Sequence, residues 1–279
     1  MFNRTLLFFC ISLFGSIPAR AFDFDFQQAL SLAKNARQAT KTIDQPEEIQ
    51  IGHGIATKLL GASPLLPDNK VQQYVNQVGR WLSLYTERPD LPWQFGVLES
   101  TDINAFSTPG GTIFITNGLL QRLNNESELA GVLAHEIVHV LRKHHLAALQ
   151  KAARMDIASD LAGEALKDKG NPAVLDKAIK AGTEVYARGL DKNDEFEADR
   201  MGIVIATRAG YDPYGLPAVL QMLDAINAQD SSLALMFKTH PAPRERLNLL
   251  DKLMGDRFDA YTDPVQTDQR FLSAVSRRQ

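Results

Sequence analysis

The stretch from residue 132 to residue 141 is almost entirely apolar, yet it contains two histidines and a glutamate. Asn125 followed three residues later by Glu128 resembles a capping box, which predicts that a long helix begins there and runs to about Lys151. The apolar neighbours predict that this helix is buried. Burial of imidazole and carboxylate groups costs free energy unless they are paired or bound to a cation. The fold must therefore supply a partner for these groups within its core.

The spacing of the polar residues in this stretch indicates a metal site. His135 and His139 are four residues apart, so on a helix they project from one face and can offer ring nitrogens to a single tetrahedral cation. Glu136 lies about 100° further round the helix, beside the open coordination position, where it can take a proton from a bound water. The alternative is a chance match, in which both histidines are core residues with ordinary hydrogen-bond partners.

A second helix is expected to complete the site, because zinc hydrolases use three protein ligands and leave a fourth position to water. Glu195 and Asp199 are again four residues apart, on a helix predicted to begin near Asp194. Glu195 would bind the metal, and Asp199 would accept the free ring N–H of a histidine ligand. The alternative is a solvated acidic helix face, which the histidine pair makes the weaker interpretation. Glu197 faces elsewhere and is expected to pair with an arginine or a lysine.

The other histidines receive separate interpretations. His144 and His145 are expected to end the histidine-bearing helix, where cationic side chains are favoured by the helix dipole. His53 is predicted to be a surface or packing residue. His240 precedes a helix in a loop, from which it could reach the site as an oxyanion donor or as a reversible fourth ligand.

The rest of the pattern predicts an α+β fold that is mainly helical, with a small sheet packed on the metal-binding helix. Residues 93–99 and 112–116 alternate enough to be strands, and a turn-rich segment at 104–111 joins them. The other predicted elements are helices, at 46–60 with Gly61 closing it, 68–82, 119–123, 152–190 with an interruption at 170–172, 216–228, and from Pro243 to near Gly255.

The N-terminal residues 1–21 have the three-part layout of a secretory signal peptide. Arg4 precedes an apolar run from residue 5 to residue 17 that is short for a membrane span, and Ala19 and Ala21 provide small residues for cleavage. A retained N-terminal anchor is the alternative. We therefore expect 22–45 to be an N-terminal arm of the exported chain, 46–255 the metallopeptidase domain and 256–279 a C-terminal tail.

Cysteine usage and charge exclude several classes of function. The single cysteine, Cys10, lies within the predicted signal peptide, and Phe9 before it is not the small residue of a lipoprotein signal. The mature chain is thus expected to lack disulfides, thiol catalysis and a lipid anchor. The net charge is −3, without the basic excess of a nucleic-acid binder, so no nucleic-acid partner is expected.

Together these segments resemble the family of zinc metallopeptidases that includes the CAAX prenyl protease, the membrane protease HtpX and the periplasmic β-barrel assembly-enhancing protease, the last group being the most similar. The resemblance covers roughly residues 46–250. The matching pieces are His135-Glu136-x-x-His139, Glu195-x-x-x-Asp199, Asn104-Ala105-Phe106 with Pro109-Gly110-Gly111, and His240-Pro241 with Arg246.

The resemblance implies a zincin fold of the gluzincin type with one Zn²⁺ per chain. It implies that His135, His139 and Glu195 bind the zinc and that Glu136 is the general base. It further implies that Asp199 supports a ligand and that His240 approaches the metal from a mobile loop, with Arg246 close behind. The strand 112–116 resembles the family's substrate-binding edge, which would pair with an extended peptide. The substrate-binding residues in that strand would be Thr112, Ile113, Phe114 and Ile115.

Two departures from the family shape the expected function. No segment after residue 21 is apolar enough to span a membrane, and we expect no helical repeat domain. The chain is therefore expected to be a periplasmic, soluble endopeptidase that cleaves misfolded or misassembled envelope proteins, and the resemblance allows peripheral association with membrane-assembly machinery. The alternative from another class is a zinc-stabilised chaperone or binding module that holds unfolded envelope proteins without cutting them.

Overall fold

The computed structural model describes residues 43–159, 189–226, 230–261 and 268–275. The predicted signal peptide, nearly all of the predicted arm at 22–45 and most of the amphipathic stretch at 152–190 lie outside the described residues. Within the described part of the chain, no helix combines the length and the apolar character that crossing a membrane requires.

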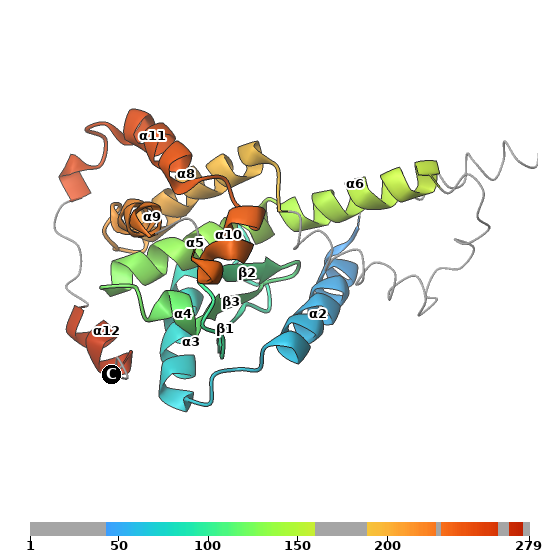
Figure 1. The fold of residues 1–279 in the computed structure, drawn as a ribbon, viewed down its shortest axis with the longest axis horizontal. Coiled ribbons are helices and arrows are strands. Elements are labelled where there is room, and N and C mark those ends of the chain that lie inside the picture. Colours follow the sequence, from blue (N-terminus) through green and yellow to red (C-terminus); the bar gives the residue numbers. More distant parts are fainter. Residues whose placement is uncertain (1–42, 160–188, 227–229, 262–267, 276–279) are drawn as a thin grey trace, which may run out of the picture. The chain divides into compact units, whose positions relative to one another are not determined.

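Among the described residues, two helices precede the sheet, close to where the sequence predicts them (Figure 1). Helix α2 (Gln45–Ala62) begins at Asp44, whose carboxylate accepts a hydrogen bond from the Glu47 amide. Gly61 does not close this helix, which ends after Ala62. Helix α3 (Asn69–Ser83) begins at Asp68 in the same way, because a short acidic side chain can accept from the free amides of a first turn.

The sheet has three strands rather than the two expected. Strands β1 (Gln94–Leu98) and β3 (Thr112–Thr116) are parallel, and β2 (Ala105–Thr108) pairs antiparallel with β3, so the order is β1-β3-β2. The prediction of a turn throughout 104–111 was therefore wrong for its first half. Its small polar residues are typical of turns, but β3 supplies them with backbone partners. Gly110 and Gly111 have φ values of 82° and 106° and make the tight return to β3.

The histidine-bearing helix α5 (Glu126–Leu141) is buried along its whole length, as predicted. It follows the short helix α4 (Asn117–Leu120), and Asn125 caps it by accepting from the Glu128 amide. The prediction of one helix to about Lys151 was wrong, because the chain turns at Arg142 and Lys143. Lys143 has a φ of 57°, which interrupts the helix between α5 and helix α6 (His144–Ser159).

The described residues from 192 onward are mainly helical. Their elements are α8 (Lys192–Arg208), α9 (Gly215–Ala225), the 3₁₀ turn Ser231–Leu233, α10 (Ala234–Thr239), α11 (Pro243–Met254), the 3₁₀ turn Asp259–Tyr261 and α12 (Asp268–Ala274). The sequence pattern predicts no element after Gly255, yet Phe271 of α12 is buried in the main core.

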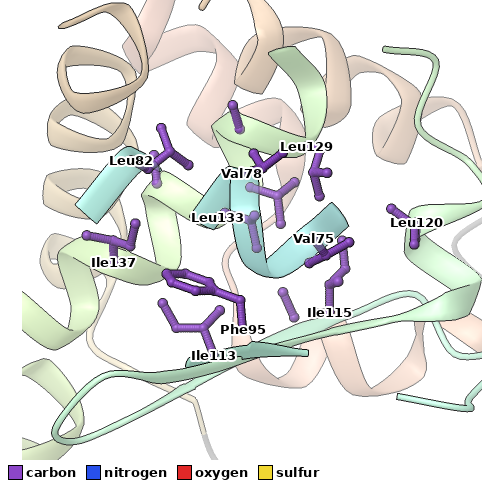
Figure 2. Close-up of a cluster of buried hydrophobic side chains, with 14 of the residues drawn as sticks. Val75, Val78, Leu82, Phe95, Ile113, Ile115, Leu120, Leu129, Leu133 and Ile137 are labelled. Atoms are coloured by element: carbon purple, nitrogen blue, oxygen red, sulfur yellow. The ribbon is translucent and has the colours of Figure 1, made fainter. Parts of the chain in front are cut away.

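The main core lies between the sheet and the helices α3 and α5 (Figure 2). The side chains labelled there are Val75, Val78 and Leu82 of α3, Phe95, Ile113 and Ile115 of the sheet, Leu129, Leu133 and Ile137 of α5, and Leu120 of the short helix α4. The predicted packing of a small sheet on the histidine-bearing helix is thus confirmed.

Helices α5 and α8 approach closely because Gly202 carries no side chain. A Cβ added at Gly202 would lie 2.9 Å from the backbone nitrogen of His135. We expect Gly202→Ala to force the two helices apart and to lower the free energy of unfolding by about 1–3 kcal/mol, measured by urea denaturation. Gly61→Ala is the matched control, since no atom lies within 4 Å of its added Cβ. A Gly202→Ala protein as stable as the wild type would contradict this account of the packing.

Candidate metal centre

Helices α5 and α8 bring together the three side chains that the sequence predicts as metal ligands. His135, His139 and Glu195 each offer one ligand atom, and these atoms all lie within 4.8 Å of one another. The Nε2 atoms of the two histidines are 3.0 Å apart. The carboxylate oxygens of Glu195 lie 3.6 Å from Nε2 of His135 and 3.7 Å from Nε2 of His139. All three side chains are buried.

The polar atoms at this point fit a divalent cation. Glu195 Oε1 is buried, and it has no hydrogen-bond partner among the residues that the structure describes. Burial, together with the neighbouring His135, holds the pKa of His139 well below its usual value, so that ring is neutral and keeps a free lone pair. A set of two nitrogens and one carboxylate oxygen is typical of metal sites that leave a position open.

Asp199 lies next to His135, as the sequence predicts. Its Oδ1 is 3.0 Å from His135 Nδ1, and its Oδ2 accepts a hydrogen bond of 2.8 Å from Arg246 Nε. Burial alone would raise the pKa of Asp199, but the adjacent guanidinium outweighs it and the pKa falls well below its usual range. Asp199 is therefore ionised and can accept a proton-bearing nitrogen of His135.

His240 reaches the cluster through Glu195. Its Nδ1 is 2.6 Å from Glu195 Oε2, and its ring centroid is 5.7 Å from that of His135. Burial tends to lower the pKa of His240, but the Glu195 carboxylate more than compensates and the pKa is raised. The residue caps the C-terminal end of α10, at the edge of the site.

Glu136 lies beside the cluster and has a partner that sequence reasoning missed. The Ser107 hydroxyl of β2 donates a hydrogen bond of 2.7 Å to Glu136 Oε2, and both side chains are buried. Ser107 falls in the segment read as a turn, so it gave no signal of its own. Only the prediction of a strand at 105–108 could have indicated that the Ser107 side chain faces α5.

The expected dipole role of His144 was wrong. Because α5 ends at Leu141, His144 begins α6 instead of ending the preceding helix, and its side chain is buried. Its Nδ1 lies 3.0 Å from Nδ1 of His139, and the His145 ring centroid is 5.5 Å from that of His139. His53 is exposed, as predicted.

The prediction for Glu197 is confirmed. Its carboxylate forms an ion pair with Arg142, whose Nε lies 3.1 Å from Glu197 Oε1. Both side chains are partly exposed, so this pair contributes little to stability.

Two pockets flank Glu136, and His240 and Ala105 line both. The first is mostly apolar, with walls that include Leu119, Val132, Leu216, Val219, Leu220, Leu223 and Met236. The second is lined by Phe106, His139, His145 and Leu190 among others. The cluster thus lies between two cavities, one of which suits an apolar side chain.

The predicted substrate-binding strand does not have the expected position. Thr112, Ile113, Phe114 and Ile115 belong to β3, which is the central strand and is buried throughout. Both of its edges are already paired, by β1 and by β2, so a peptide cannot add to it. The strand next to the site is β2, and its residues Ala105 and Phe106 line the second pocket.

Comparison with known proteins identifies a peptidase family and several similar proteins. The model of peptidase family M48 matches residues 69–254. The chain is 32% identical over 215 residues to the beta-barrel assembly-enhancing protease of Escherichia coli K12, covering 75% of this chain and 44% of that protein. It is 31% identical over 250 residues to a putative beta-barrel assembly-enhancing protease of Vibrio cholerae, covering 88% and 51%.

A mitochondrial protein is also similar. The mitochondrial metalloendopeptidase OMA1 of Schizosaccharomyces pombe is 26% identical over 184 residues, covering 66% of this chain and 53% of that protein. The chain therefore spans about half the length of the curated relatives that it matches.

Proposed function

The chain belongs to peptidase family M48, whose matched relatives include named metalloendopeptidases, and from this premise we propose that it is an exported zinc endopeptidase that cleaves misfolded or misassembled envelope proteins. The observation that carries the proposal is the position of Glu136, between two pockets and beside three converging ligand side chains. Support for the compartment comes from the signal-peptide pattern of residues 1–21 and from relatives named beta-barrel assembly-enhancing proteases. Peripheral association with membrane-assembly machinery belongs to the same proposal.

In this proposal His135, His139 and Glu195 hold one Zn²⁺ in a gluzincin-like arrangement. A zinc ion bound there supplies Lewis acidity, which activates water and polarises a carbonyl group. Asp199 accepts the Nδ1–H of His135 and so keeps that ring's Nε2 lone pair directed at the ion.

Glu136 performs the proton transfers. Its carboxylate accepts a proton from the attacking water and then delivers it to the amine that leaves when the peptide bond breaks. The Ser107 hydroxyl holds the carboxylate in place during both steps. His240, which lines both pockets and is anchored on Glu195, would donate a hydrogen bond to the carbonyl oxygen as it becomes negative.

The substrate is proposed to be an extended peptide segment with an apolar side chain next to the cleaved bond. The apolar lining of the first pocket favours such a side chain. Strand β2, at the end of the sheet order, is the proposed partner for the peptide backbone. Unfolded envelope proteins expose both features, which folded proteins conceal.

Ser107→Ala should lower kcat about tenfold or more with little change in KM, because a hydrogen bond to a charged group contributes about 1.5–3 kcal/mol. Steady-state kinetics on a fluorogenic peptide would measure this effect. Ser83→Ala removes an equally buried hydroxyl, one that donates to the Arg80 carbonyl, and should leave kcat unchanged. Equal effects of the two variants would argue against a role for Ser107 at Glu136.

The proposed function is tested by incubating the full chain with casein, before and after metal removal by a chelator. We expect cleavage that stops on chelation and returns when Zn²⁺ is added, with cut sites next to apolar side chains when the products are mapped by mass spectrometry. A zinc-loaded protein that binds unfolded casein without cutting it would support the chaperone alternative instead.

A further inference from the structure

We propose that His144 is a positioning residue, which holds His139 in the tautomer and orientation that direct its Nε2 toward the metal. This inference rests on the proposed function, since it assigns a partner to one of the three proposed ligands. Asp199 contacts the outer nitrogen of His135, and His144 contacts the outer nitrogen of His139.

The distances around His139 and His144 indicate which nitrogen donates and which accepts in each hydrogen bond. For His139 to offer the lone pair of Nε2, its proton must be on Nδ1, which lies 3.0 Å from Nδ1 of His144. His144 must then accept at Nδ1 and carry its own proton on Nε2. The groups nearest that proton are carboxylates of α8, since Glu197 Oε2 is 3.5 Å and Asp194 Oδ1 is 3.7 Å from His144 Nε2.

With these donors and acceptors, His144 links the two helices of the site, α5 and α8. One side of its ring faces a ligand on α5, and the other faces acidic residues on α8, the helix that also carries Glu195. A metal-bound histidine usually donates its second N–H to an acceptor, which fixes the ring and raises its basicity as a ligand. Here a neutral imidazole provides that acceptor.

The backbone between the two histidines is built to allow this contact. In a continuous helix, two residues five positions apart would point about 140° away from each other. The turn at Lys143, with its φ of 57°, brings His144 back toward His139. Such a conformation is strained for a residue with a side chain, and it persists where the surroundings impose it.

The side chain of Lys143, at this turn, contacts Glu48 of α2. The ammonium group of Lys143 lies 2.9 Å from Glu48 Oε2. Glu48 is buried and is held by Arg88, whose two terminal nitrogens lie 3.0 and 3.1 Å from its oxygens, and by the Gly110 amide. A third helix therefore contacts the turn that brings His144 to the site.

The first test is the tautomer of each ring in the zinc-loaded, full-length protein. Long-range ¹H–¹⁵N spectra of histidine-labelled protein distinguish a proton on Nδ1 from one on Nε2, and His144→Gln identifies the signals of residue 144. We expect His139 to carry its proton on Nδ1 and His144 on Nε2. A proton on Nδ1 of His144 would overturn the proposal without affecting the proposed function.

The second test is the affinity for Zn²⁺, measured by competition with a chromophoric chelator. His144→Ala should weaken binding about 10- to 100-fold, the range typical for loss of such a partner. His144→Gln should recover most of that loss, because its carbonyl can accept from His139 while its amide faces α8. His53→Ala removes an exposed histidine and is the control, with no change expected.

One outcome of the binding test would count against His144. A folded His144→Ala protein that binds Zn²⁺ as tightly as the wild type overturns the proposal. If His144→Ala does not fold, the His144→Gln affinity and the wild-type spectra still decide it. A wild-type protein that takes up no Zn²⁺ would remove the proposed function as well, so the two failures are distinguishable.

Discussion

Replacing Glu136 by glutamine should abolish peptide-bond hydrolysis while the metal stays bound. Glutamine has nearly the same shape and its amide oxygen can still accept the Ser107 hydroxyl, but it cannot take a proton from water. General acid–base catalysis contributes about 10²- to 10⁴-fold, so the rate of casein cleavage should fall by at least about 100-fold. The measurement combines cleavage rates with zinc content by atomic absorption.

Glu99→Gln is the matched control for this experiment, because it removes an exposed carboxylate and should change neither cleavage nor zinc content. If Glu136→Gln kept its activity, the proton would have to be transferred by another group, and the assignment of the base would be wrong. Loss of activity together with loss of zinc would show a structural role for Glu136 and would not establish the base.

The centre of the site was predictable because its geometry is local. Residues four apart on a helix share a face whatever the rest of the chain does, so the sequence pattern placed His135 near His139 and Glu195 near Asp199. Apolar flanks predicted that the first pair is buried, and the structure has both pairs at one point. The only further step was to assume that the two helices meet.

The features that were missed depend on contacts between distant segments. Strand β2 exists because β3 offers it a paired edge, and its own residues favour a turn as strongly as a strand. The end of α5 is marked by neither glycine nor proline, and Lys143, which has a positive φ there, pairs with the distant Glu48. His144 was misassigned for this reason, since its place depends on that turn.

The C-terminal helix α12 was missed on similar grounds. The helix is short, and its two large apolar residues, Phe271 and Leu272, are adjacent and give no periodic signal. It is held by Arg270, which forms an ion pair with Glu126, a buried carboxylate that also accepts a hydrogen bond of 2.6 Å from the Tyr74 hydroxyl. Glu126 is the first residue of α5, so this segment contacts the start of the histidine-bearing helix.

Arg246→Met should cause a large loss in the free energy of unfolding. Arg246 and Asp199 are both buried and form a bidentate ion pair. Removal of the guanidinium leaves a buried carboxylate without its cation, which costs about 3–5 kcal/mol in the free energy of unfolding. Urea denaturation of the metal-free protein, in excess chelator, measures this loss without a contribution from bound zinc.

Arg244→Met is the control, because Arg244 is exposed and its pair with Asp224 is at the surface, where such pairs contribute little. A second variant, Asp199→Leu combined with Arg246→Met, removes both charges and should recover much of the lost stability while leaving zinc binding weak. Without that recovery, the loss in Arg246→Met would reflect packing of the arginine side chain and not an unpaired charge.

The pH dependence of the free energy of unfolding provides an independent test of the Asp199–Arg246 ion pair. Burial raises the pKa of Asp199 and Arg246 lowers it by more, so the folded-state pKa lies below the unfolded value of about 3.9. The pair therefore contributes stability above about pH 4, and the contribution is lost as the pH falls through the folded-state pKa. In Arg246→Met the guanidinium no longer offsets the effect of burial, so the pKa of Asp199 should rise, although the contact with His135 remains. The difference in unfolding free energy between wild type and variant should then shrink as the pH falls from 7, once the variant's carboxylate protonates; a constant difference would contradict the ion-pair account.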